Sequence, residues 1–378
     1  MNSELITLRK ELHKYPELSG NESNTANYIQ SFITKHYPGT IISNIGGPSF
    51  AVIYEFGTTG TTVAIRCELD ALPIAEVNDF EHRSKNNGVS HKCGHDGHMS
   101  IVSGLIFWLQ QQTFNNGKVI LLFQSAEETG KGAYKMLEDS KLSTLHIDYI
   151  FALHNIPGVD LHTIITMDKG FSAEVESLII SLTGLASHAA EPEKGINPSL
   201  TISEIIQQLN AYNQSNPLDD DFAVLTPVHI NMGEISYGIS PAHGAIHYTI
   251  RTWNTTQMQL LKQRIEKIIN KIAALHKLTY ELTWLEHFPA SENNNSCNTI
   301  IKEVAKEHQF NVLERPYPFK FGEDFGWFSK NYKTGMFGLG SGINTPPLHN
   351  PSYDFPDEII ETGIQMFGGI IKKLLTTK

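Results

Sequence analysis

The stretch Lys118-Val-Ile-Leu-Leu-Phe-Gln-Ser-Ala-Glu-Glu128 joins an almost continuous apolar run to two carboxylates. An apolar run without polar alternation predicts a strand that is covered on both faces, as in a parallel sheet. A helix is expected at residues 132–137, and a second apolar strand, 149–153, follows it and ends at His154. Strands that alternate with helices predict an α/β fold whose mainly parallel mixed sheet is flanked by helices.

The residues before this stretch fit the same pattern. Helical spacing of apolar residues predicts helices at 3–14 and 22–36, and two strand-like runs follow at 51–55 and 62–66. Asp70 comes just after the second of these strands. Ligands of open α/β sheets bind beyond the carboxyl ends of the strands. Asp70, the Glu127-Glu128 pair and His154 are therefore expected to meet at one edge of the sheet.

A cluster of metal-binding residue types lies between these strands, in His91-Lys-Cys-Gly-His-Asp-Gly-His98, ahead of a predicted helix at 99–112. Cys93 and His95 are ligands of the kind that hold zinc, manganese, cobalt or nickel. Asp96 is suited either to bind a metal or to orient a neighbouring imidazole. The alternative is a polar loop whose histidines only form hydrogen bonds.

Later segments supply enough further ligands for two metal ions. The candidates are Cys93, His95, Glu128, His154 and His349, the last in a Gly- and Pro-rich loop at 341–350. Five ligands with a thiolate able to bridge suit two divalent ions, which polarise a carbonyl and lower the pKa of a shared water. If one carboxylate of the Glu127-Glu128 pair binds metal, its neighbour is free to act as a general base.

The pattern changes near residue 172. Strands at 175–182, 224–232, 245–251 and 279–284 and helices at 198–209 and 258–275 follow the order βαββαβ, which is that of a ferredoxin-like α+β unit. We therefore expect an inserted domain at 172–287 and a discontinuous catalytic domain at 1–171 and 288–378. An edge strand and the long helix of the inserted domain also suit a dimer interface.

Composition limits the partners and the compartment. With 378 residues, 40% hydrophobic and 18% charged, the chain is globular, and its net charge of −11 argues against nucleic acid or an anionic membrane as a partner. Three cysteines form no disulfide framework, and neither a signal peptide nor a membrane helix is predicted. A cytoplasmic protein is expected.

Within the helix predicted at 3–14, His13 is expected to lie on the surface of the protein.

The motifs together resemble one known family. Residues 91–98, Phe123-Gln-Ser-Ala-Glu-Glu128, Leu153-His-Asn155, Ser187-His-Ala-Ala190 and Leu348-His-Asn-Pro351 look like the motif set of the aminoacylase, hippurate hydrolase and auxin-conjugate amidohydrolase group. This group is related to the dinuclear zinc carboxypeptidases and dipeptidases. The resemblance extends over essentially the whole chain.

The resemblance implies a role for each candidate residue. The ligands of two divalent ions, zinc or manganese first and cobalt or nickel as alternatives, would be Cys93, His95, Glu128, His154 and His349. Glu127 would activate water and then protonate the departing amine, and Asp70 would orient a histidine ligand. The inserted domain would be the lid and dimerisation domain, in which His188 would stabilise the oxyanion and Arg251 would bind the substrate's carboxylate.

Two positions depart from the family pattern. Relatives usually have Asp where this chain has Glu68, and asparagine is common where this chain has Gly238. The resulting hypothesis is a metal-dependent amidohydrolase that cleaves N-acyl amino acids and forms a homodimer through the lid domain. The alternatives are a dipeptidase or carboxypeptidase on the same scaffold, a catalytically silent binding protein, and a thiol hydrolase with Cys93 as the nucleophile.

Overall fold

The computed structural model describes residues 2–168 and 170–376, which form two compact units. Unit 1 consists of 1–171, 291–318 and 323–378, and unit 2 of 172–290 and 319–322. The predicted boundary at 171/172 is the same, whereas the predicted boundary at 287/288 lies at 290/291 in the structure. The short segment 319–322, which was expected in the catalytic domain, belongs to unit 2.

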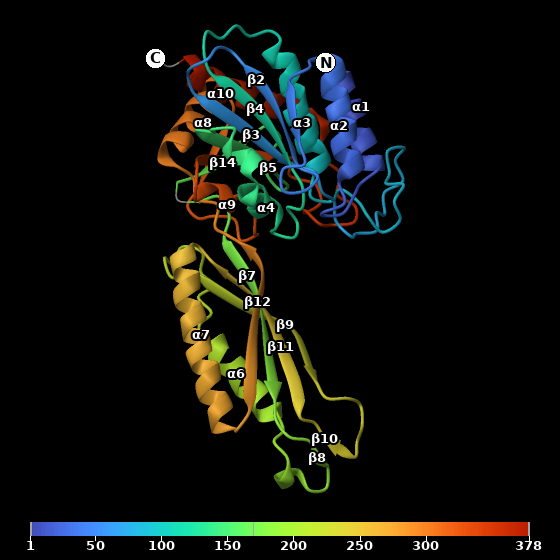
Figure 1. Cartoon of the computed structure of the whole chain (residues 1–378), viewed down its shortest axis with the longest axis vertical. Helices are drawn as coiled ribbons and strands as arrows, with labels where there is room; N and C mark the ends of the chain where they lie inside the picture. The colour runs from blue at the N-terminus through green and yellow to red at the C-terminus, as the bar shows by residue number, and fades with distance from the viewer. Residues whose placement is uncertain (1, 169, 377–378) are drawn as a thin grey trace. The chain divides into compact units, whose positions relative to one another are not determined.

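Unit 1 is built around a mixed sheet flanked by helices (Figure 1). Among the described residues this sheet has eight strands in the order β1-β2-β4-β3-β5-β14-β6-β13. The central strands β4, β3, β5 and β14 are mutually parallel, while β1, β2 and β6 pair antiparallel with a neighbour. The elements are α1 (Asn2–Lys14), α2 (Ser23–His36), β1 (Thr40–Ser43), β2 (Phe50–Glu55), β3 (Thr62–Glu68), α3 (His95–Leu109), β4 (Lys118–Gln124), α4 (Gly132–Glu138), α5 (Ser140–Ser143), β5 (Tyr149–Ile156), β6 (Ile164–Met167), α8 (Asn295–Glu307), β13 (Val312–Arg315), α9 (Gly326–Ser329), β14 (Lys333–Gly340), η2 (Asp357–Ile359) and α10 (Ile360–Thr376).

The central strands are apolar because both of their faces are covered. On one face, alternate residues of β2, β3 and β4 pack into a core with α1, α2, α3, α8 and α10. On the sheet's other side, α4 contacts β4, and α9 contacts β14 and α4. The carboxyl ends of parallel strands lie at the same edge, so β3, β4, β5 and β14 deliver the segments that follow them to one place. The predicted fold class is confirmed.

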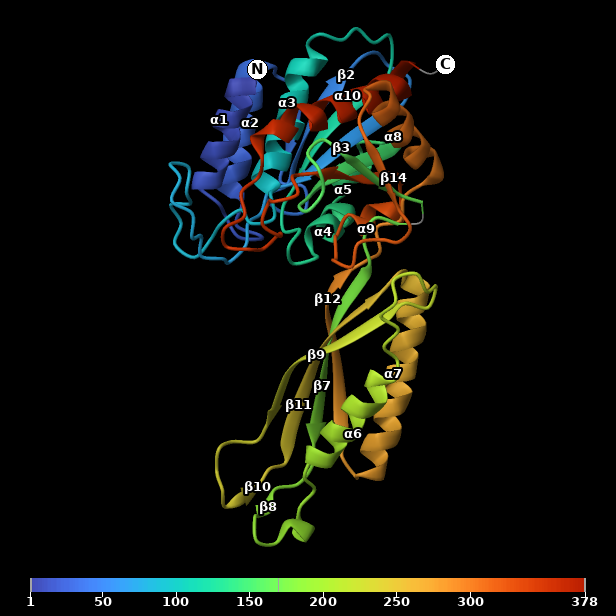
Figure 2. The same ribbon diagram turned by 180° about the vertical axis from the view of Figure 1, so that it is seen from behind.

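Unit 2 has the predicted βαββαβ order, with a four-stranded antiparallel sheet in the order β12-β7-β11-β9 among its described residues. Helices α6 and α7 pack on one face of this sheet through an apolar core that includes Leu178, Ile205, Ile246 and Ile265 (Figure 2). The elements are β7 (Glu174–Thr183), β8 (Ser187–His188), η1 (Pro192–Lys194), α6 (Ser199–Asn210), β9 (Ala223–Met232), β10 (Ile239–Ser240), β11 (His243–Thr252), α7 (Thr255–Leu275) and β12 (Thr279–Phe288).

Two local predictions are wrong. The helix expected at 99–112 spans His95–Leu109, so the second half of the cluster at 91–98 is its first turn rather than part of a loop. His13 is buried rather than on the surface, because it faces carboxylates of other segments. No helix in the described part of the chain combines the length and the apolar character that crossing a membrane requires.

Candidate metal centre

Gly94 allows Cys93 and His95 to share a site. Its φ of 95° is left-handed, and it immediately precedes α3. A Cβ at this position would lie 2.7 Å from the side chain of Asn155, so both the conformation and the space favour glycine. The turn places Cys93 and His95 in one buried cluster with His154 of β5, and the three ligand atoms lie within 4.8 Å of one another.

The remaining predicted ligands complete a second, overlapping cluster. Cys93, Glu128 and His349 also have ligand atoms within 4.8 Å of one another, so Cys93 is common to both sets. Nε2 of His95 lies 3.9 Å from Oε1 of Glu128, and Nε2 of His349 lies 3.9 Å from Oε2 of the same carboxylate. The structure therefore brings all five predicted ligands together. The thiol of Cys93 is shared by the two sets, and the carboxylate of Glu128 lies between the imidazoles of His95 and His349.

Hydrogen bonds orient two of the imidazoles toward this centre. Nδ1 of His95 donates to the backbone oxygen of Asp70 at 2.8 Å, and Nδ1 of His154 donates to the backbone oxygen of Asn155 at 2.9 Å. A carbonyl oxygen only accepts, so the proton of a neutral ring is on Nδ1 and the lone pair is on Nε2. Nε2 of His154 lies 3.5 Å from Sγ of Cys93. Such bonds to the second ring nitrogen are typical of metal-binding histidines.

The donor set fits divalent ions. Two buried polar atoms of the cluster have no hydrogen-bond partner among the described residues: Nε2 of His95 and Oε1 of Glu128. Buried polar atoms are almost always satisfied, so two such atoms 3.9 Å apart need an explanation. Thiolate, imidazole and carboxylate ligands are those that zinc and its neighbours prefer. We conclude that these residues are able to hold two such ions.

Burial changes the acidity of the metal-free side chains. Burial raises the pKa of Cys93 well above its usual range, and the nearby carboxylates of Glu128 and Glu127 raise it further. Burial lowers the pKa of His154 to about 3. It also raises the pKa of Glu128 to about 7, with Asp70 adding to the effect and His95 opposing it. A dication among these groups favours the thiolate, the carboxylate and the neutral imidazole together.

Glu127 lies beside the ligands. Its Oε2 is 4.0 Å from Nε2 of His95, and its Oε1 accepts a hydrogen bond of 3.3 Å from the backbone amide of Asp324. Burial raises the pKa of Glu127 well above its usual range, and the carboxylates of Glu323 and Glu128 add to the rise. A carboxyl group with a raised pKa next to a metal centre suits proton transfer near neutral pH.

A buried ion network that the sequence analysis did not assign lies next to Glu127. Arg66 of β3 is fully buried and makes ion pairs with Glu68, Glu323 and Asp324. The other oxygen of Glu68 is 2.6 Å from Nδ1 of His98. In the sequence, this network is indicated only by Arg66 itself, a charged residue at the end of the otherwise apolar strand predicted at 62–66. Glu68, one of the two positions expected to depart from the family pattern, thus joins Arg66 to His98.

Asp96, in the cluster at 91–98, contacts a second charged network, which includes His13 and Arg9 of α1. Oδ2 of Asp96 lies 2.8 Å from Nδ1 of His13 and 3.2 Å from the guanidinium of Arg9. Nε2 of His13 lies 3.0 Å from Glu76. Of the two roles considered for Asp96, the geometry favours orientation of the motif, since this carboxylate faces α1 rather than the ligand cluster.

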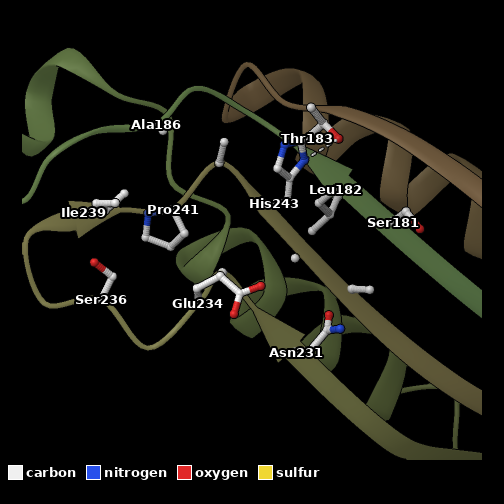
Figure 3. Close-up of a pocket in the computed structure, with 14 residues that line it drawn as sticks. Ser181, Leu182, Thr183, Ala186, Asn231, Glu234, Ser236, Ile239, Pro241 and His243 are labelled. Carbon is white, nitrogen blue, oxygen red and sulfur yellow. Dashed lines mark hydrogen bonds between the residues drawn. The ribbon is translucent and has the colours of Figure 1, made fainter.

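His188 and Arg251 belong to unit 2, and their predicted roles stay predictions. His188 is exposed in β8, where its Nδ1 accepts a hydrogen bond of 3.0 Å from the amide of Ala190. Arg251 in β11 donates to the backbone oxygen of Lys320 at 2.6 Å. Unit 2 also has a pocket of about 550 Å³ near the ends of β7 and β11, where Oγ1 of Thr183 lies 3.2 Å from Nδ1 of His243 (Figure 3). Neither His188 nor Arg251 lines this pocket.

The fold is that of a known class of hydrolases. The model of peptidase family M20/M25/M40 matches residues 64–373, and the chain therefore belongs to this family. The protein is a hydrolase, and the resemblance inferred from the sequence is confirmed.

Individual relatives agree with this assignment. An N-acetyl-L-cysteine deacetylase of Bacillus subtilis (strain 168) is 29% identical over 369 residues, which cover 95% of this chain and 85% of the relative. The crystal structure of the Bacillus subtilis YXEP protein, described as a dinuclear metal binding peptidase of family M20, has a TM-score of 0.86 at 25% identity and covers 100% of this chain and 99% of its own. A putative aminohydrolase from methicillin resistant Staphylococcus aureus has the same fold, with a TM-score of 0.90 at 22% identity and coverage of 99% and 97%.

Proposed function

We propose that this hydrolase cleaves the amide bond of N-acyl amino acids and releases a carboxylic acid and an amino acid. The observation that carries the proposal is the convergence of five ligand side chains around Cys93, with the carboxylate of Glu127 beside them. The similarity to an N-acetyl-L-cysteine deacetylase supports this substrate class. Two divalent ions, zinc or manganese or else cobalt or nickel, would be held by Cys93, His95, Glu128, His154 and His349.

When bound, the two ions supply Lewis acidity that polarises the amide carbonyl and makes water acidic enough to ionise near neutral pH. Glu127 takes a proton from the attacking water as the oxygen of that water bonds to the acyl carbon. Glu127 then delivers this proton to the amide nitrogen as the C–N bond breaks, so that the amino group leaves neutral. Asp70 orients the ring of His95, and its Oδ1 lies 3.5 Å from Nδ1 of that ring. His188 would stabilise the oxyanion, and Arg251 would bind the carboxylate of the amino acid.

The test of the base is Glu127→Gln. This variant keeps the shape of the side chain but cannot shuttle a proton, so we expect two metals per chain and a loss of kcat of at least about 10²-fold. Metal content and hydrolysis of N-acetyl amino acids are measured together. Glu303→Gln, an exposed position on α8, is the matched control and should leave both unchanged. Normal turnover in Glu127→Gln would refute the assignment.

A substrate panel separates the rival functions. Hydrolysis of acetyl- and benzoyl-amino acids in preference to dipeptides supports the proposal, whereas the reverse order indicates a dipeptidase or carboxypeptidase. Binding without cleavage by the metal-loaded protein indicates a silent binding protein. Inactivation by a thiol reagent with both metals retained indicates Cys93 as a nucleophile.

We also propose a homodimer that forms through β9 of unit 2. β9 is an edge strand, and its residues 226–232 are exposed. Ile230 pairs with Ile246 and Met232 pairs with Gly244 of β11, so they lie on the sheet face that α6 and α7 cover elsewhere. An apolar edge that continues a core face is costly to leave in water. A second copy of β9 offers both the strand pairing and the apolar surface that would cover it.

A further inference from the structure

The turn that carries Glu127 and Glu128 has an unusual backbone. It follows β4, and Ala126 in it has a φ of +56°. L-residues rarely adopt this left-handed conformation, and glycine or asparagine usually occupies it. Because Ala126 directly precedes Glu127, its conformation determines the direction in which both carboxylates leave the end of β4. The amide of Gly132 at 3.0 Å and the hydroxyl of Thr129 at 3.3 Å donate to the backbone oxygen of Ala126 within the turn, so the amide of Ala126 is the group left for a partner outside it.

Side chains of three separate segments bind the amides of this turn. The amide of Ser125 donates to Oγ of Ser49 at 2.9 Å, that of Ala126 to Oε1 of Glu22 at 2.7 Å, and that of Glu128 to Oδ2 of Asp70 at 2.9 Å. Asp70 and Ser49 sit on or beside strands of the same sheet. Glu22 is different, because it precedes the helix α2 and not a strand of this sheet.

Capping of its own helix does not explain Glu22. It occupies the position before α2, but its side chain makes no capping hydrogen bond to that helix. The residue is fully buried, and its Oε2 has no hydrogen-bond partner among the described residues. A buried carboxylate is costly, and besides the backbone amides of Gly20 and Glu22 it is the amide of the strained residue Ala126 that stabilises it.

We propose that Glu22 is a positioning residue whose carboxylate holds Ala126 in the left-handed conformation and so fixes the directions of Glu127 and Glu128. The inference rests on the proposed roles of these two carboxylates as base and ligand. Glu22 itself acts only through the backbone of the turn. Its loss should therefore affect turnover and metal retention together, with little effect on substrate affinity.

Three variants of Glu22 and one matched control test this role. Glu22→Leu removes the acceptor, Glu22→Gln keeps a carbonyl oxygen for the amide of Ala126, and Glu22→Asp keeps the charge but withdraws it from the turn. Glu17→Leu is the control, because Glu17 binds the amide and hydroxyl of Thr25 at the start of the same helix and does not bond to the turn. We measure the melting temperature, kcat, KM and the rate at which a chelator removes zinc.

Glu22→Leu should lower kcat by roughly tenfold to a hundredfold with KM within about threefold, because misplaced catalytic groups lose rate rather than binding. It should also lose zinc roughly tenfold faster. Glu22→Gln should stay within about threefold of the natural protein in both measurements. Glu17→Leu should lower the melting temperature but leave kcat and zinc release unchanged.

Two outcomes overturn the proposal: equal losses in Glu22→Leu and Glu22→Gln, or a loss of kcat in Glu17→Leu as large as that in Glu22→Leu. If Glu22→Leu does not fold, Glu22→Asp takes its place and should show the same losses. If the natural protein hydrolyses no N-acyl amino acid, only the proposed function fails. The zinc-release rates then decide on Glu22, and equal rates in the natural protein and Glu22→Leu overturn its role.

Discussion

Replacing Arg66 by methionine should destabilise unit 1 strongly. The guanidinium is fully buried inside β3, where it pairs with Glu68, lies 3.0 Å from Glu323 and 2.9 Å from Asp324, and donates to Gln124 at 2.8 Å. Methionine fills a similar volume but leaves the carboxylates buried without this cation. Removing one member of a buried ion pair costs about 3–5 kcal/mol, most of which is the penalty of the charges left behind.

The cost in Arg66→Met should depend on pH in a defined direction. Burial raises the pKa of Glu68, but Arg66 and His98 hold it well below its usual range; without the guanidinium this pKa rises, so the folded variant binds more protons than the folded natural protein. Its stability relative to the natural protein therefore increases as the pH falls. Each proton taken up reduces the cost by about 1.36 kcal/mol per pH unit, or about 2.7 kcal/mol between pH 7 and pH 5.

The assay is urea unfolding of chelator-treated protein at pH 7 and pH 5, since bound metal would add its own stabilisation. Arg83→Met is the control: Arg83 is exposed, its guanidinium donates to the backbone oxygen of Glu76, and its loss should cost less than about 1 kcal/mol. A cost below about 1 kcal/mol for Arg66→Met at pH 7, or a cost that grows on acidification, would refute the reasoning.

Two further predictions concern His13 and β9. Burial alone would lower the pKa of His13, but Asp96 and Glu76 raise it to about 9, so the stability that its charge contributes is complete below the unfolded pKa of about 6.5 and is lost as the pH rises through 9. The gap in melting temperature between the natural protein and His13→Gln should therefore be largest near pH 6 and shrink by pH 10, and a constant gap contradicts the assignment. Ile230→Lys should convert the proposed dimer into monomers in sedimentation velocity, whereas Thr283→Lys on the opposite edge strand β12 should not; a natural protein that is monomeric, or a variant that stays dimeric, argues against the β9 interface.

The central strands of the sheet could be predicted from the sequence, because the apolar runs that indicate them are local features. The apolar runs at 118–123 and 149–153 indicated doubly covered strands, and β4 and β5 are found there. The polar residues after these runs converge because parallel strands share one edge, a rule that needs no knowledge of side-chain contacts. The same rule explains why Cys93, Glu128 and His349 meet although they are far apart in the sequence.

The surroundings of the ligands were not predictable in this way, because they depend on contacts between distant segments. Nothing local distinguishes Glu22 from any acidic residue that precedes a helix, and its function as an acceptor appears only when Ala126 lies beside it. His13 was misplaced for the same reason, since helical periodicity does not show that Asp96 and Glu76 face it. Arg66 did carry a signal, as a charge inside a strand whose neighbours are all apolar, but its partners Glu323 and Asp324 come from the other end of the chain.

The excess of buried negative charge explains why metal binding and folding should be linked in this unit. Many carboxylates of this unit have an exposure of 5% or less, and among them are Glu22, Glu68, Asp70, Glu127, Glu323 and Asp324. Arg66 is a single guanidinium among them and pairs with Glu68, Glu323 and Asp324, whereas Oε1 of Glu128 in the ligand cluster stays unsatisfied. Uncompensated buried charge is destabilising, and two dications at the cluster would neutralise several carboxylates at once. The free energy of metal binding is then also free energy of folding, so the residues that make the centre reactive when loaded are those that weaken the unit when it is empty.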